Sequence, residues 1–330
     1  MGSNYIELIT YLLVVIIALT FSVINTSKLS DSVKFLIFMV VSTGLSLVVR
    51  LSNFDTDIQT YAESMRFESL SFYYFREPVV WFGQRFLFSL IGSEFIVFFL
   101  FDLLMFTVTY LALRNYRLPY YAFFSFLTFF PFILGMQNVY RQWVSVLFCL
   151  LAISYSFGSS RSAVRYFTFF ISGLSHNVAG VFLAPFLMLS SSKIFRFFGV
   201  GILFLTPLII HFASGTKSAT STGASLAFAY VFVICLITIF MFLSMRLKIY
   251  SREIKALTIL ISSFFVVFAS VFMLSSTAAE RVGLFSLCLL YPHLILFCER
   301  YYKQRFLLRS LIVIFGFFPL LLFGTRHFIL

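Results

Sequence analysis

The chain has 330 residues, of which 61% are hydrophobic, and its mean hydropathy is +1.01. This composition, with apolar runs of membrane-crossing length recurring from end to end, excludes a soluble globular protein and predicts an all-α, polytopic helical membrane protein. The net charge of +12 does not indicate nucleic-acid binding, because the basic residues lie in short loops between apolar runs.

Ten apolar runs are long enough to cross a bilayer. They cover residues 5–24, 35–49, 94–113, 119–136, 142–158, 197–212, 225–245, 256–275, 283–298 and 309–325. Segment 78–92 contains a Gly-Gln-Arg interruption, which predicts an interfacial or re-entrant helix. Segment 165–190 carries His176 and Asn177 near its centre, which predicts two short helices that meet at a polar apex. We therefore expect about 10 to 12 transmembrane helices in a single domain, 1–330.

The positions of the basic residues orient these spans. If six short loops face the cytoplasm, they hold sixteen of the 24 basic residues but three of the 12 acidic ones, as the positive-inside rule requires. These loops are 25–34, 114–118, 159–165, 191–196, 246–255 and 299–309. Both chain ends and the loops at about 50–77 and 213–224 then lie on the extracytoplasmic side.

The cysteines argue against a disulfide framework and against a structural metal site. All four lie in apolar segments without CxxC or Cys/His spacing: Cys149, Cys235, Cys288 and Cys298. The outer loops hold no dense group of carboxylates and histidines, so nothing in the sequence requires a metal ion or another cofactor.

Unusual polar residues gather on the predicted outer side. Arg50 precedes the first large outer loop, and Asp57 and Tyr61 follow at i, i+4 spacing, which places both on one face of a helix. Glu77 stands before Pro78, at a predicted helix start. Helix capping is the simpler explanation of Asp57 and of Glu77 when each is taken alone.

A second polar group begins a predicted span. It consists of Asn138, Tyr140, Arg141 and Gln142. An arginine at this depth must face water or find an acceptor, and the neighbouring amides make this end rich in donors that suit an anion. An arginine that snorkels to the interface is the alternative explanation.

The remaining polar candidates are His176, at the apex of 165–190, and the pair Glu280 and Arg281. A packed histidine and an exposed ion pair, worth about 0–1 kcal/mol, are the simpler explanations. Ionisable residues at a membrane edge are nevertheless costly and tend to be functional. Because all these groups fall on one predicted face, we expect them to form an active site open to the outside.

The pattern resembles the Wzy-type polysaccharide polymerases, in particular the EpsG-like branch of O-antigen and exopolysaccharide polymerases. The resemblance spans most of the chain and rests on Arg50, Thr56-Asp57, Tyr61, Glu77-Pro78, Asn138, Arg141-Gln142, His176 and Arg281. The sequence departs from the family at Asp55, where a small residue is commoner. It departs again at Phe285, where a tyrosine is commoner after Arg281, although Tyr291 could substitute for it.

The resemblance implies a fold like that of the GT-C glycosyltransferases, in an enzyme of the bacterial inner membrane that acts at the periplasmic face. It implies that a growing glycan leaves undecaprenyl pyrophosphate and joins an incoming lipid-linked repeat unit, as in lipopolysaccharide biosynthesis. The partners are then the lipid-linked oligosaccharides and membrane lipid. Chain-length control in this family usually belongs to a partner protein.

The residues suit this chemistry without a metal. Fixed guanidinium groups can stabilise the charge of a pyrophosphate leaving group, and Arg141 and Arg281 are the candidates, with Arg50 third. A carboxylate or an imidazole can take the proton of the acceptor hydroxyl. Three residues compete for that role, and Asp57 is favoured because a neighbouring arginine would keep it ionised. The competitors are Asp57, His176 and Glu280, and the predicted substrate-binding residues are Arg50, Tyr61, Glu77, Asn138, Tyr140 and Gln142.

Three alternatives stay open. An O-antigen ligase shares the donor lipid and an outer-facing site. A transporter or flippase of lipid-linked oligosaccharide would place polar residues near the midplane or on both sides, with internal symmetry, whereas this chain places them at one end. A membrane O-acyltransferase would use a histidine but would leave Arg141 and Arg281 without a role.

Overall fold

The structure, a computed structural model, describes residues 2–52, 56–66, 72–158, 162–213, 227–244, 251–301 and 305–323. In these ranges the chain forms fifteen α-helices and two short 3-10 helices, which confirms the all-α prediction. Outside them lie Asp55, the predicted outer loop 213–224 from residue 214 onward, and parts of the predicted loops 50–77, 159–165, 246–255 and 299–309.

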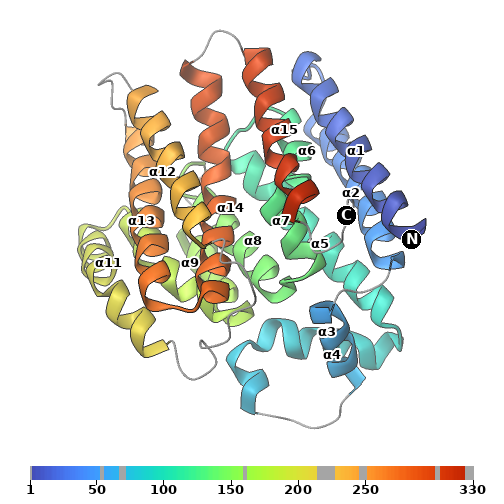
Figure 1. The fold of residues 1–330 in the computed structure, drawn as a ribbon, viewed down its shortest axis with the longest axis horizontal. Coiled ribbons are helices and arrows are strands. Elements are labelled where there is room, and N and C mark those ends of the chain that lie inside the picture. Colours follow the sequence, from blue (N-terminus) through green and yellow to red (C-terminus); the bar gives the residue numbers. More distant parts are fainter. Residues whose placement is uncertain are drawn as a thin grey trace.

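Six of the described helices are long and apolar enough to cross a membrane. They are α1 (Gly2–Val23), α2 (Asp31–Leu51), α5 (Glu94–Asn115), α11 (Lys193–Ala213), α13 (Ser251–Met273) and α14 (Ser276–Tyr301). Two further apolar helices, α12 (Ala227–Ser244) and α15 (Arg305–Phe323), run alongside α14 (Figure 1). With α8 (Tyr140–Ser154) they make a bundle of roughly antiparallel helices, as expected for a multi-pass membrane protein.

The predicted span 119–136 is wrong as a single helix. The chain forms two short helices there, α6 (Tyr121–Leu127) and α7 (Phe130–Gln137). Pro131 stands in the first turn of α7, and Phe129 before it is extended, with φ −67° and ψ 126°. A proline has no N–H to continue a preceding helix but fits the first turn of a new one. The break turns the chain so that α7 leads into the corner before α8.

Segment 165–190 is broken as the sequence predicts, whereas segment 78–92 forms one short, continuous helix. Segment 165–190 forms α9 (Ser162–Ser175), a 3-10 helix η2 (Asn177–Phe182) and α10 (Leu183–Met188), with His176 at the junction. Segment 78–92 forms α4 (Pro78–Ile91), whose 14 residues rise about 21 Å and fall short of a hydrocarbon core of about 30 Å.

The short helix α4 lies at one end of the bundle. It is accompanied there by α3 (Thr56–Arg66) and the 3-10 helix η1 (Phe72–Arg76) (Figure 1). These three elements cover the end of the bundle where α8 and α14 begin. Asp57 and Tyr61 of α3 thus lie beside the first turns of α14 and α8.

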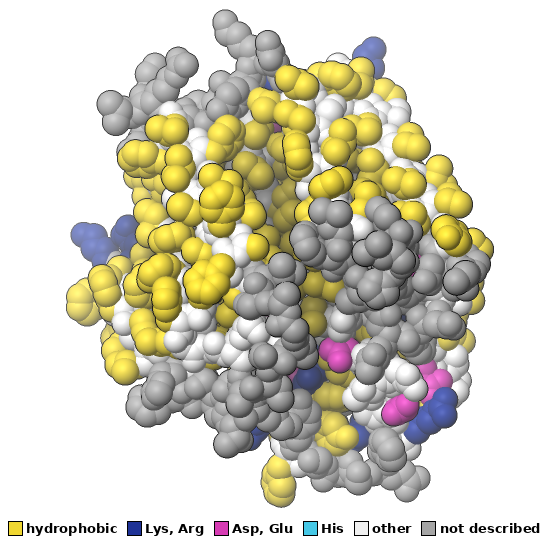
Figure 2. All heavy atoms as spheres, viewed as in Figure 1, with side chains coloured by type: hydrophobic (Ala, Val, Ile, Leu, Met, Phe, Trp, Pro, Cys, Tyr) yellow, Lys and Arg dark blue, Asp and Glu magenta, His cyan; other side chains and the backbone are white. Residues whose placement is uncertain are grey.

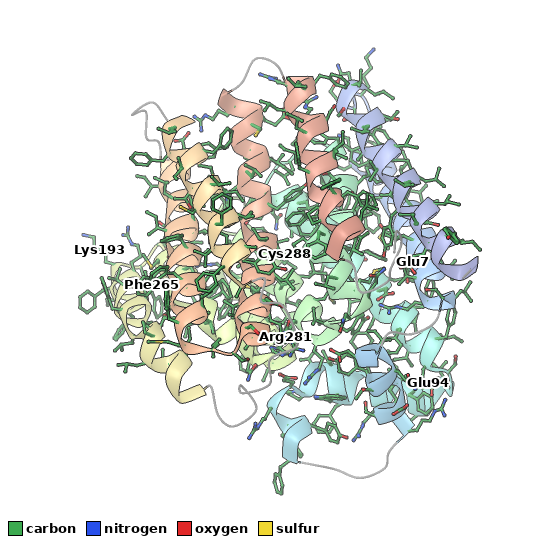
Figure 3. All side chains as sticks on the ribbon, in the orientation of Figure 1. Glu7, Glu94, Lys193, Phe265, Arg281 and Cys288 are labelled. Carbon is green, nitrogen blue, oxygen red and sulfur yellow. The ribbon has the colours of Figure 1, made fainter. Side chains whose placement is uncertain are left out.

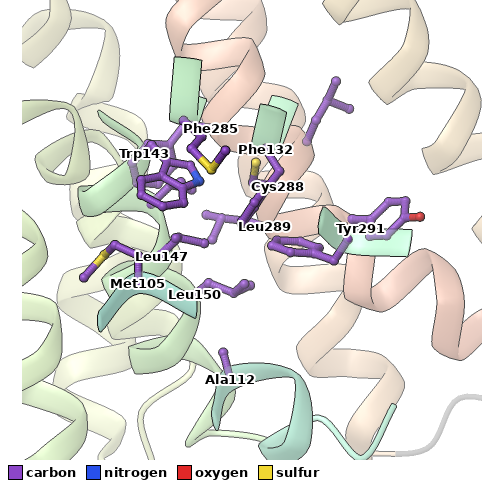
Figure 4. Close-up of a cluster of buried hydrophobic side chains, with 14 of the residues drawn as sticks. Met105, Ala112, Phe132, Trp143, Leu147, Leu150, Phe285, Cys288, Leu289 and Tyr291 are labelled. Carbon is purple, nitrogen blue, oxygen red and sulfur yellow. The ribbon is translucent and has the colours of Figure 1, made fainter. Parts of the chain in front are cut away.

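Helices α5, α7, α8 and α14 meet in a central core (Figure 4). Its largest side chain is Trp143, 1% exposed, which packs edge-on against Phe106 and Phe132 with ring centroids 6.2 Å and 5.3 Å away. Gly135 makes room for the indole, since a Cβ at this position would lie 2.6 Å from Trp143 Cδ1. Lipid tails are as apolar as these side chains, so close packing of this kind holds the helices together.

The outer surface of the bundle is apolar over the middle of the long helices (Figure 2). Leu36 on α2, Phe204 on α11 and Phe232 on α12 are each more than 60% exposed. An exposed hydrophobic surface of this extent marks contact with a membrane. The protein is therefore a membrane protein with several spanning helices.

Close packing predicts unequal effects at two glycines of α11. A Cβ at Gly199 would lie 2.7 Å from the Met188 backbone nitrogen and 2.9 Å from the Ala184 oxygen, whereas at Gly201 it meets nothing within 4 Å. We expect Gly199→Ala to lower the free energy of unfolding by about 1–3 kcal/mol through forced separation of α10 and α11. Unfolding of the detergent-solubilised protein measures the loss. Gly201→Ala is the control, and equal stability of the two variants would contradict the packing argument.

Candidate functional site

Residues from five separate segments converge at the end of the bundle that α3 and α4 cover. They are Asp57 and Tyr61 of α3, Glu77 before α4, Arg141 of α8, His176 before η2, and Arg281 of α14. Figure 3 shows Arg281 at the end of α14 that faces this cover. Six of the eleven predicted site residues are thus joined by direct contacts, although they span more than 200 positions of sequence.

Local sequence fixes the direction of each group. Asp57 and Tyr61 are one helical turn apart on α3, so both project toward α8 and α14. Glu77 occupies the N-cap position of α4, directly before Pro78, with φ −141° and ψ 61°. The proline starts the helix and thereby leaves the glutamate side chain outside it, beside α8. Arg141 is the second residue of α8 and meets that carboxylate.

The Glu77 carboxylate is the centre of a buried cluster. Arg141 Nη1 donates to Glu77 Oε2, and Arg141 Nε donates to the Tyr61 hydroxyl at 3.3 Å. The Arg141 guanidinium carbon lies 5.2 Å from the Tyr61 ring centroid and 4.8 Å from that of Trp81, within the range of cation–π attraction. Burial raises the pKa of the Glu77 carboxyl, and Arg141 opposes this shift. The carboxylate, the hydroxyl and the two aromatic rings together fix the position of the Arg141 guanidinium.

His176 is the third member of this cluster and is neutral. Its Nδ1 accepts a hydrogen bond from the Val178 N–H at 3.1 Å, and its Nε2 lies 3.4 Å from Glu77 Oε1. Burial, together with the positive charges of Arg141 and Arg281, lowers the pKa of the imidazole to about 3. A neutral imidazole that accepts at Nδ1 carries its proton on Nε2. The protonated Nε2 of His176 thus faces Glu77 Oε1, while Nδ1 is occupied as an acceptor.

The lowered pKa predicts a pH dependence of stability. Between about pH 3 and the unfolded value of about 6.5, the unfolded chain holds a proton on His176 that the folded chain lacks. Stability therefore falls as the pH drops through this window. We expect His176→Gln, which keeps a donor without a titrating group, to show a shallower decline than the wild type in melting temperature between pH 6.5 and 4. Parallel curves would contradict a neutral, buried His176.

Asp57 and Arg281 form a second, more open pair. Arg281 Nη2 lies 3.8 Å from Asp57 Oδ2, and both side chains are 39% exposed. This distance is too long for a hydrogen bond, and water screens a pair of this exposure. Arg281 also lines a small pocket together with Gln142, Trp143 and Phe285. The pair is therefore accessible to a ligand and loosely held.

Arg50 and Tyr140 belong to a separate, fully buried network. Arg50 Nε and Nη2 donate to the two carboxylate oxygens of Asp102 at 2.8 Å and 2.9 Å, and the Tyr140 hydroxyl donates to Asp102 Oδ1 at 2.9 Å. Ser46 donates to the same carboxylate at 2.6 Å. Tyr140 and Arg141 are consecutive, so their side chains leave α8 about 100° apart and reach different neighbours. A substrate-binding role for Arg50 and Tyr140 stays a prediction.

Sequence reasoning missed Asp102. The signal was present, because an aspartate inside the apolar 22-residue helix α5 must find a partner within the membrane. It also missed Glu7, a fully buried residue of α1 (Figure 3). Gln137 Nε2 and the Ser52 hydroxyl both donate to the Glu7 carboxylate, the latter at 3.2 Å. These networks tie α1 and α2 to α5 and α7.

The other predicted residues lie near the cluster in different ways. Gln142 is buried and shares the pocket of Arg281, while Asn138 is half-buried and ends α7, its N–H bonded to the Leu134 oxygen at 2.9 Å. Glu280 precedes Arg281 on α14, and consecutive helical residues do not face the same way.

The suggested substitution of Tyr291 for a tyrosine near Arg281 is wrong. Tyr291 lies ten residues beyond Arg281 on α14, about 15 Å along the axis. Its hydroxyl is bonded to Ser125. Phe285 itself stacks on Phe182, with ring centroids 4.5 Å apart.

The described residues contain no group of three or more His, Cys, Asp or Glu side chains that could hold a metal ion. The four cysteines are free. The site instead offers two guanidinium groups, an accessible carboxylate and a tyrosine hydroxyl. Such groups can bind an anion and accept a proton.

Comparison with known proteins gives a family match over nearly the whole chain. The model of the EpsG family matches residues 33–328, a range that contains all eleven predicted site residues. No curated protein and no solved structure matches the chain.

Proposed function

Because this chain belongs to the EpsG family, which is of the Wzy type and implies a membrane-bound polysaccharide polymerase, we propose that it polymerises O-antigen repeat units carried on undecaprenyl pyrophosphate. The growing glycan leaves its lipid and joins the incoming lipid-linked unit. The reaction takes place at the periplasmic face of a bacterial inner membrane. The excess of basic residues in the loops at the opposite end of the bundle supports this orientation.

The observation that carries the proposal is the loose pair of Asp57 and Arg281 beside the buried cluster of Glu77, Arg141 and His176. A lipid pyrophosphate brings several negative charges to the membrane surface. Arg281 is accessible and only weakly paired, so its guanidinium can exchange Asp57 for the pyrophosphate oxygens. Arginine suits this role because its planar donors match phosphate geometry. Binding of the donor lipid would therefore release the Asp57 carboxylate.

The released carboxylate fits the role of general base. A hydroxyl oxygen of the incoming unit attacks the anomeric carbon of the growing glycan, and the bond from that carbon to the pyrophosphate oxygen breaks. The bonding electron pair leaves with undecaprenyl pyrophosphate, whose charge Arg281 stabilises. The hydroxyl proton passes to Asp57. Among the three predicted bases, geometry favours Asp57, since His176 Nδ1 already accepts a hydrogen bond from the Val178 N–H and its Nε2 carries a proton facing Glu77.

The buried cluster positions the open pair. Arg141 holds Tyr61 on the same helix as Asp57, one turn away. Glu77 and His176 hold Arg141 in turn. The cluster therefore fixes α3 relative to α8 and η2, and with it the place of Asp57 opposite Arg281. Catalytic groups need such support because small displacements of a reacting group cost large factors in rate.

Reconstitution tests the proposed activity. The purified protein in proteoliposomes is supplied with an undecaprenyl-pyrophosphate-linked repeat unit and with lipid A core, and products are separated by size. We expect a ladder of glycans on lipid and release of one undecaprenyl pyrophosphate per linkage formed. Two other results would each refute a polymerase: transfer of single units to lipid A core only, as by a ligase, or movement of the intact lipid between leaflets, as by a flippase.

A further inference from the structure

A large apolar groove lies between α7, α12, α14 and α15. Its volume is about 590 Å³, and among the described residues that line it none carries a charge or an amide. Tyr230 and Val233 line it from α12, and Leu311 and Gly316 line it from α15. Polar ligands would lose their hydrogen bonds to water there. Figure 2 shows the hydrophobic face of the molecule hollowed between α12 and α15, so the groove opens toward lipid.

The groove adjoins the pocket of Arg281. Pro131 lines both. On α14 the pocket is lined by Arg281, Leu284, Phe285 and Cys288, and the groove by Leu287, Tyr291, Leu294 and Cys298. Within each set the positions recur three or four residues apart, and the two sets lie on adjoining faces of α14, about 100° apart around its axis. From residue 281 to 298 the lining positions rise about 26 Å, most of a hydrocarbon core of about 30 Å.

We propose that this groove holds the polyisoprenyl tail of the lipid whose pyrophosphate contacts Arg281, an inference that rests on the proposed function. A cavity of this size left empty would sacrifice packing contacts, so a hydrocarbon chain fills it in the bilayer. The cationic pocket at its end selects a chain that carries an anionic head. The tail then lies along α14, and the head stands beside Asp57 and Arg281.

The groove positions the lipid substrate. It does not attract the tail out of the bilayer through the hydrophobic effect. A tail loses no contact with water when it moves from lipid into the groove, so the hydrophobic effect does not favour the transfer. What the groove supplies is shape: it fixes the depth and direction of the tail and hence the place of the pyrophosphate. Obstructing it should weaken binding of a long tail but spare a lipid too short to occupy it.

The test uses one repeat unit on two lipids, undecaprenyl pyrophosphate and a farnesyl pyrophosphate analogue. Val233→Trp and Gly316→Phe narrow the groove from opposite walls. Ile239→Trp is the control, because Ile239 is a half-exposed aliphatic residue of the same helix as Val233 but lies outside the lining. We expect the KM for the long-tailed substrate to rise about tenfold in both groove variants, with an unchanged KM for the short-tailed one. The control should match the wild type for both substrates.

A photoreactive undecaprenyl phosphate provides a readout without catalysis. Crosslinks on α12 and α15 of the wild type, reduced in Val233→Trp and retained in Ile239→Trp, support the groove. Crosslinks confined to other helices, or groove variants with wild-type KM for both tails, overturn it. Absence of polymer from the wild type with either lipid refutes the proposed polymerase activity, whereas the crosslinks still decide the groove. A melting temperature equal to that of the wild type shows that a variant is folded. Because Val233→Trp and Gly316→Phe lie on different helices, misfolding of one variant leaves the other to test the groove.

Discussion

Replacing Arg281 by alanine is expected to lower the polymerisation rate about 10²–10³-fold, the usual effect of removing one donor that stabilises developing charge. In cells the long-chain glycan ladder should collapse while the protein persists in the membrane. The amount of protein should be preserved because Arg281 is 39% exposed and paired only loosely with Asp57. Loss of an exposed pair costs little stability. The rate loss is measured with purified protein in proteoliposomes, and the ladder by electrophoresis.

Arg141 is expected to behave differently from Arg281. Alanine at Arg141 removes the hydrogen bond to Tyr61 and leaves Glu77 buried without its cation, so both activity and stability should fall. The combination of losses separates a positioning arginine from one that contacts the pyrophosphate. Arg281→Lys sharpens the distinction, because a lysine keeps the charge but loses the planar donors, and an intermediate rate is expected.

Arg66→Ala is the matched control for Arg281→Ala. Arg66 ends α3, is 70% exposed and pairs with Glu94 at the same end of the bundle. Its loss removes one positive charge from the same surface but none from the site, so chain extension should be unaffected. A normal ladder from Arg281→Ala would refute the assignment. So would an equal loss of activity from Arg66→Ala, since net surface charge would then be the cause.

Much of the helix pattern follows from sequence. Hydropathy gives the long spans, and His176 marks the break in segment 165–190 correctly, whereas Gly83, Gln84 and Arg85 do not interrupt α4. The failure at 119–136 has a local cause. The run is apolar throughout, so hydropathy cannot distinguish one helix from two, and the break at Pro131 depends on the extended backbone of Phe129. Some membrane helices tolerate a proline inside an apolar run. Pro131 alone therefore does not show whether residues 119–136 form one helix or two.

The sequence predicts at which end of the bundle each site residue lies, but not which neighbouring helix its side chain faces. Loop charges place a residue near one end of the bundle, and the six joined residues do lie at one end. Charge patterns do not say which side of a helix faces which neighbour. Tyr140 and Arg141 illustrate this, because they are adjacent in sequence yet reach Asp102 and Glu77 in separate clusters. Arg50 likewise has the predicted depth but faces α5.

Replacing Asp102 by alanine is expected to cause the largest loss of stability in the chain, about 3–5 kcal/mol, as for other buried ion pairs that lose one partner. The Asp102 side chain is 0% exposed and that of Arg50 1%. The guanidinium would then remain in the bilayer with the Met136 carbonyl at 3.1 Å and the rings of Phe98 and Tyr140 as its neighbours. Unfolding of the solubilised protein measures the loss.

The double variant Arg50→Met with Asp102→Leu shows whether the network of Arg50 and Asp102 has a structural role or a substrate-binding role. Apolar residues of similar volume can replace a buried ion pair without loss of stability, so we expect the double variant to recover most of the stability that Asp102→Ala loses. Because Arg50 lies outside the cluster of Glu77 and Arg281, we also expect chain extension to return with it. Recovered folding without recovered extension would instead assign Arg50 the substrate-binding role that the sequence predicts. Failure to recover stability would show that the network needs its charges to hold α2, α5 and α8 together.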